Sequence, residues 1–103
     1  MELGIKDRLY IPQILSQKNN FAEYSLKKSI ISKVAINKKD SEEYEIKETE
    51  GVVTWNSDKD SNTPLIVEFS KDEIAYIKKS CEALIDTAYP DDFWETVKKI
   101  YVS

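Results

Sequence analysis

The sequence contains no histidine, one cysteine, two glycines and three prolines. The lack of histidine removes the commonest general base and the commonest metal ligand among side chains. A single cysteine, Cys81, excludes an internal disulfide and is typical of a reducing compartment. Two glycines are too few for a glycine-rich phosphate loop, a dinucleotide-binding fingerprint or a nucleophile elbow. The missing residue types therefore predict a protein that is not an enzyme and that holds no cofactor or metal.

The length and hydropathy of the chain predict one domain outside membranes. Of the 103 residues, 41% are hydrophobic, which is enough for one core, and no linker divides the chain, so we expect residues 1–103 to form a single domain. The mean hydropathy is -0.51, and no apolar run approaches the roughly 18 residues of a transmembrane helix. Residues 1–7 lack the apolar stretch of a secretory signal. We therefore expect a cytoplasmic protein with no membrane contact.

Positive and negative charges are unevenly divided along the chain. Residues 1–39 carry a net charge of +5, whereas residues 40–103 carry -9. One interpretation is that the two halves pack against each other. The other is nucleic-acid binding by the lysine-rich second helix, with Lys27 and Lys28 among the phosphate contacts. The pI of about 4.9 favours the first interpretation, because nucleic-acid-binding domains are usually basic.

The first half of the chain predicts two helices. The apolar pattern of residues 5–15 indicates a short helix that ends before Pro12, because proline has no N–H to donate and disturbs the preceding turn. Asn20 and Glu23 form a capping box, which marks the start of a second helix. Apolar side chains at four-residue spacing then predict an amphipathic helix over residues 21–35.

The middle of the chain predicts a small antiparallel sheet over about residues 44–69. Apolar and polar residues alternate there, and Glu50-Gly51 is the strongest turn signal in the sequence, so we expect a β-hairpin around it. The polar residues 56–63 are expected to form a loop, and a further strand is expected after Pro64.

The last third predicts two more helices. Ser70 and Glu73 form a second capping box, and the apolar stripe from Ile74 to Ala88 indicates a helix of about four turns. Pro90, followed by two aspartates, begins another helix. The predicted fold is therefore α+β, with two N-terminal helices, a small sheet and two C-terminal helices.

Three features could carry chemistry, and each has a simpler structural explanation. Residues 58–62 begin like a calcium-binding loop, but Thr63 replaces the required glycine, so we interpret them as a solvated loop. The adjacent acids at residues 42–43 and 91–92 diverge on a helix and suit its positive end. Cys81 lies in an apolar stripe, where a buried thiol is inert.

The aromatic residues near the C-terminus exceed what one short helix needs for its own packing. Among them, Trp94 and Tyr101 are candidates for a partner-binding surface, because these residue types are enriched at interface hot spots. We therefore expect a small protein-interaction module, acting by self-association or as an adaptor for another protein.

Several short segments of the first half resemble a group of small phage- and prophage-encoded bacterial proteins. These segments are Ile5 to Leu9, Asn20-Phe21, Glu42 to Tyr44 and Val53 to Asn56. The group has a leucine-rich opening, a polar helix that begins Asn-Phe, an acidic pair and a strand ending in tryptophan. Its Leu-Leu-Pro sequence is replaced here by residues 15–17, Leu-Ser-Gln. Because the group has no assigned activity, the resemblance implies a phage or bacterial cytoplasmic setting and no catalytic residue.

Overall fold

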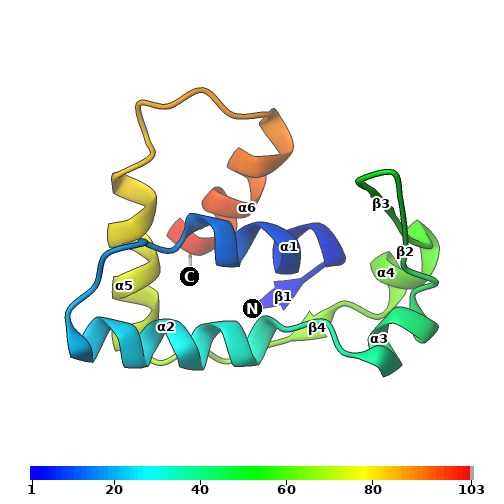
Figure 1. Cartoon of the computed structure of the whole chain (residues 1–103), viewed down its shortest axis with the longest axis horizontal. Coiled ribbons are helices and arrows are strands. Elements are labelled where there is room, and N and C mark those ends of the chain that lie inside the picture. Colours follow the sequence, from blue (N-terminus) through cyan, green and yellow to red (C-terminus); the bar gives the residue numbers. More distant parts are fainter. Residues whose placement is uncertain (103) are drawn as a thin grey trace.

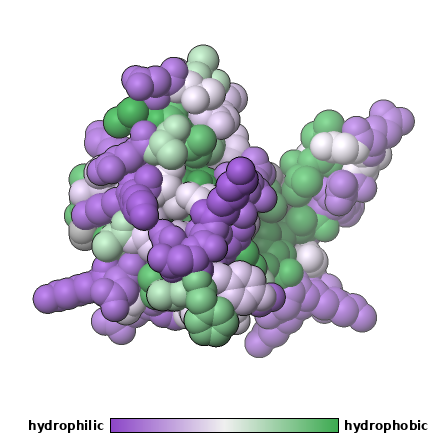
Figure 2. Space-filling model, turned by 60° about the vertical axis from the view of Figure 1, so that its left-hand side comes forward, coloured by the Kyte–Doolittle hydropathy of each residue, from purple (hydrophilic) through white to green (hydrophobic). Residues whose placement is uncertain are grey.

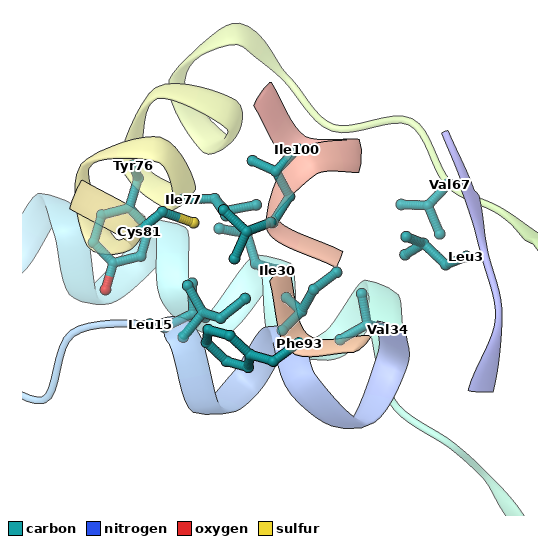
Figure 3. Close-up of a cluster of buried hydrophobic side chains, with 13 residues drawn as sticks. Leu3, Leu15, Ile30, Val34, Val67, Tyr76, Ile77, Cys81, Phe93 and Ile100 are labelled. Atoms are coloured by element: carbon teal, nitrogen blue, oxygen red, sulfur yellow. The ribbon is translucent and has the colours of Figure 1, made fainter. Parts of the chain in front are cut away.

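Four helices enclose the hydrophobic core of the protein. The computed structural model describes residues 1–102, and the four helices in it are α1 (Ile5–Ile14), α2 (Phe21–Val34), α5 (Lys71–Glu82) and α6 (Asp91–Tyr101). Helix α1 contacts α2, α5 and α6, and α5 contacts both α2 and α6 (Figure 1). Figure 3 shows side chains from all four helices meeting in one cluster.

The shorter elements lie mainly at the end of the molecule opposite α5 (Figure 1). In chain order they are β1 (Glu2–Leu3), α3 (Lys38–Glu43), β2 (Lys47–Thr49), β3 (Val52–Thr54), α4 (Ser57–Asn62) and β4 (Leu65–Ile66). Helices and antiparallel strands therefore occur together, which confirms the predicted α+β class.

The two capping boxes that were predicted from the sequence are present. At the start of α2, the Asn20 side chain accepts a hydrogen bond from the Glu23 N–H at 2.8 Å, and Glu23 accepts one from the Asn20 N–H at 3.1 Å. Ser70 and Glu73 make the same reciprocal pair at the start of α5. Each box satisfies two backbone N–H groups that a helix leaves without partners.

The predicted hairpin is also present, and it turns where expected. Strands β2 and β3 are antiparallel, with Thr49 opposite Val52, so Glu50 and Gly51 alone form the connection. Both residues have positive φ, 52° and 79°, which is the backbone of a type I′ turn. The hairpin projects from the rest of the molecule (Figure 1).

The expected single sheet over residues 44–69 is wrong. Strand β4 does not join the hairpin but pairs antiparallel with β1, with Glu2 opposite Ile66 and Leu3 opposite Leu65. The core side chains Leu3 and Val67 lie side by side as a result (Figure 3). A two-residue strand has no period to recognise, so only the folded chain could show β1.

Helix α1 corrects the prediction that a helix would end before Pro12. The helix continues to Ile14 with Pro12 inside it. Proline removes one backbone hydrogen bond in this last part of the helix, but its fixed φ suits helical geometry. Ile11 and Ile14 are almost completely buried on either side of it, and this packing holds the helix together.

Two further elements differ from the expected boundaries. Residues 56–63 were expected to be a loop, but Asn56 caps the helix α4 by accepting a hydrogen bond from the Lys59 N–H at 3.1 Å. The predicted four-turn helix ends at Glu82, and hydrogen-bonded turns follow. Beyond that point the apolar stripe no longer faces the core, because Ile85 is 60% exposed.

Candidate functional site

Three ionisable side chains, Asp7, Arg8 and Glu73, are buried. Sequence analysis did not single them out, since isolated charges among apolar residues carry no recognisable motif. Buried charges are tolerated where they are paired and hydrogen-bonded, and such groups can mark a functional site. Their surroundings therefore decide whether they are structural or functional.

Arg8 joins the ends of two helices. Its Nε donates to the Val34 carbonyl oxygen at 3.1 Å, and one terminal nitrogen donates to the Ala35 carbonyl oxygen at 2.6 Å and to Asp40 at 2.8 Å. The first two bonds satisfy carbonyls at the C-terminus of α2, where a positive charge is also favourable. Burial raises the pKa of Asp40, but Arg8 and the Asn37 N–H outweigh it, and the pKa lies below its ordinary value.

Asp7 and Glu73 are likewise fully engaged by their own chain. Asp7 accepts hydrogen bonds from Thr96 at 2.5 Å and from Lys99 at 2.6 Å, which join α1 to α6. Glu73 accepts from Lys33 at 2.6 Å and from Ser29 at 2.9 Å, which join α5 to α2. These buried charges therefore hold helices together and leave little capacity for catalysis.

A polar cleft of about 290 Å³ opens where the start of α1 meets α4 and α6. Its carboxylates are also occupied: Asp60 accepts the Ile5 N–H at 2.9 Å, and Asp92 accepts Tyr10 at 3.0 Å and pairs with Lys6. Asp60 thus caps α1, whose own N-cap residue, Gly4, has no side chain. Over residues 1–102 no group of three or more acidic or thiol side chains is arranged to hold a metal ion.

The outer side of α5 carries a different kind of site, which we call the α5 groove. It is a hollow of about 370 Å³ lined by Phe69, Lys71, Ile74, Ala75 and Lys78. The four α5 residues of the lining stand at positions i, i+3, i+4 and i+7, so they form one stripe along the helix. The opposite stripe of α5 is buried against the core.

Local sequence explains why this stripe is apolar. Phe69 and Ile74 flank the capping box of α5 at the positions of a hydrophobic staple, and both line the groove. The Lys33 ammonium group lies over the Phe69 ring, 5.7 Å from its centre. A second hollow, of about 280 Å³, shares Phe69 and Ile74 with the α5 groove and continues it toward Met1 and Val67.

The predicted partner-binding residues do not form one surface. Trp94 is half-buried and packs edge-on against Phe93 and Tyr89, with ring centres 5.2 Å and 5.8 Å apart. Tyr101 is 39% exposed, and its hydroxyl lies 3.5 Å from the Lys78 carbonyl oxygen, so it borders the α5 groove. Burial, then Cys81 and Glu82, raises the pKa of Tyr101.

The lysines of α2 are partly occupied by contacts within the chain. Lys27 donates to the Ser16 carbonyl oxygen at 2.9 Å, and Lys33 forms the ion pair with Glu73. Lys28 is exposed and lies over the Tyr24 ring, 5.9 Å from its centre. Phe21, at 84% exposure, and Tyr24, at 51%, interrupt the basic surface with apolar area.

Cys81 is buried as predicted. Burial, with a smaller effect of Glu82, raises the pKa of its thiol to about 11. The thiolate is the reactive form, so this cysteine is a poor nucleophile at neutral pH.

None of the helices in residues 1–102 combines the length and the apolar character that crossing a membrane requires. Comparison of the chain with protein families, with curated proteins and with solved structures found no match.

Proposed function

We propose that this protein is a non-enzymatic interaction module that binds another protein through the α5 groove. The observation that carries the proposal is the exposed stripe of α5, because Ile74 and Ala75 face a hollow that no other element fills among residues 1–102. A helix with apolar residues on two faces, only one of which is buried, is typical of an element that packs against a partner.

The contacts of the charged groups support a binding role over a catalytic one. The buried carboxylates and Arg8 are saturated by hydrogen bonds that connect helices, so they serve the fold. A groove with an apolar floor and charged margins matches the composition of protein interfaces, where an apolar centre excludes water and a polar rim remains wet. The resemblance of the first half to small phage-encoded proteins suggests a bacterial cytoplasmic adaptor.

The proposal is tested by cross-linking from inside the groove. Ala75 is exposed, so replacing it with photoreactive p-benzoylphenylalanine should preserve the fold. We expect a defined cross-linked protein in cells that express the chain, and the same protein should bind the purified chain. Ala75→Arg should weaken that binding at least tenfold, whereas Ala88→Arg, an equally exposed alanine outside the groove, should not.

Two other outcomes are informative. Sedimentation may show a dimer that Ala75→Arg dissociates, in which case the partner is a second copy and the proposal stands. No complex that depends on Ala75 would overturn it. Retention of DNA or RNA at low salt that Lys28→Glu abolishes would instead establish the alternative function, nucleic-acid binding by α2.

A further inference from the structure

The charge of the α5 groove differs from that of the whole protein. The chain has a net charge of -4, yet the two charged residues that line the groove, Lys71 and Lys78, are both basic. Phe69, Ile74 and Ala75 form the apolar remainder of the lining. A ligand that fits this lining presents apolar side chains between negative charges.

The neighbouring hollow on the α2 side has the opposite character. It is lined by Glu23, Asp72 and Lys79 together with apolar residues, and Lys79 is paired with Glu23 at 3.1 Å. Asp72 therefore leaves this side with excess negative charge. An acidic ligand is repelled there and is directed to the side of α5 that Lys71 and Phe69 border.

The spacing of the two lysines defines the geometry of the ligand. Lys71 and Lys78 are seven residues apart on one helix, which corresponds to about 10 Å along its axis. A second helix lying along α5 matches this distance with carboxylates seven residues apart. Ala75, at the centre of the stripe, has a short side chain that lets another helix approach closely.

Resting on the proposed function, we infer that the α5 groove binds an acidic amphipathic helix of a partner protein, with carboxylates seven residues apart on either side of apolar residues. In sequence terms, Glu-x-x-Leu-Leu-x-x-Glu is the complement of Lys71-x-x-Ile74-Ala75-x-x-Lys78. Leucines at its centre enter the hollow above Ala75 and contact Phe69 and Ile74, while the glutamates reach the lysines.

Three labelled helical peptides test this inference against the full chain by fluorescence anisotropy. All three contain the central leucines, and they differ in carrying Glu, Gln or Lys at the two flanking positions. At low salt we expect the Glu peptide to bind about three- to tenfold more tightly than the Gln peptide, and the Lys peptide to bind most weakly. The difference should narrow as salt is added, because exposed charges are screened.

Matched variants identify the site of binding. Lys71→Glu should remove the preference for the Glu peptide, whereas Lys39→Glu, the same change on α3 at the other end of the molecule, should not (Figure 1). Ala75→Arg should abolish binding of all three peptides. Circular dichroism of each variant confirms that it is folded.

The outcomes separate this inference from the proposed function. Equal binding of the Glu and Gln peptides, or tighter binding of the Lys peptide, overturns the acidic helix. A natural partner that still requires Ala75 leaves the proposed function standing in that case. If neither the peptides nor any protein binds in a manner that depends on Ala75, both fail.

Discussion

Residue by residue, the stability of this protein depends on a few charged side chains that contact distant parts of the chain. Arg8 bonds to groups 26 to 32 residues away in the sequence, and Asp7 to groups 89 and 92 residues away. Capping residues such as Asn20 and Ser70 act on backbone only three residues away. Local motifs therefore reveal the caps, whereas nothing in the local sequence reveals the buried charges.

Replacement of Arg8 tests its role at the end of α2. Arg8→Lys keeps the positive charge but cannot hold three oxygens in the planar arrangement of a guanidinium group. We expect the free energy of unfolding to fall by about 1–2 kcal/mol in urea denaturation. Lys6→Ala, which removes an exposed ion pair of the same helix, is the control and should have little effect. Equal effects of the two variants would contradict the assignment.

Acid should selectively remove the stabilisation supplied by Glu73. Burial raises its pKa, but Lys33, the Ser70 N–H and Ser29 together outweigh burial, so the pKa lies below the ordinary value of 4.5. A lowered pKa in the folded state stabilises the protein above the unfolded-state value, and this stabilisation is lost as pH falls through the folded-state pKa.

The comparison is between the wild-type chain and Glu73→Gln in urea denaturation from pH 7 to pH 3. The difference in free energy of unfolding should be constant down to about pH 4.5 and shrink below it. Glu48→Gln on the exposed strand β2 is the control and should show no such trend. A difference that grows on acidification would reverse the sign and refute the account.

At the level of single elements, α5 combines a core face with a binding face. Ile77 and Cys81 point into the core, whereas Ala75 is exposed (Figure 3). The spacing of apolar residues predicted the first face and the start of the helix. It did not predict the groove, because Ile74 was assigned to the same stripe as Ile77, and only the packing of neighbouring elements separates the two.

The two faces should respond differently to substitution. Ile77→Ala leaves a cavity in the core and should lower the free energy of unfolding by about 2–4 kcal/mol. Ala75→Arg places a good helix former on the exposed stripe and should change it by no more than about 0.5 kcal/mol. Urea denaturation measures both. Comparable destabilisation by Ala75→Arg would show that the α5 groove is closed in solution.

For the molecule as a whole, the two oppositely charged halves do meet. Five ion pairs between described residues connect residues 1–39 with residues 40–102. They do not simply join a basic half to an acidic one, since Asp7 and Glu23 supply the negative partner in two of them. The interpretation of the charge asymmetry as internal packing is thus supported in part, and it leaves fewer lysines for phosphate.

Hydrogen exchange should distinguish the four-helix core from the projecting hairpin. The core helices contact one another, whereas β2 and β3 chiefly contact each other, and a two-stranded hairpin is only marginally stable by itself. We expect amides of β2 and β3 to exchange far faster than those of Ile30 and Ile77, read by NMR or mass spectrometry. Equal protection would mean that the hairpin is covered in solution.

The sequence by itself determined the helix starts, the hairpin turn and the α+β class, because caps, turn residues and apolar periodicity act over a few neighbouring residues. Only the tertiary structure decided the pairing of β1 with β4, the helical state of Pro12 and of residues 57–62, and the location of the buried charges. Each of these depends on groups brought together from distant parts of the chain. The α5 groove belongs to the same class, since a hollow exists only where separate elements leave a surface uncovered.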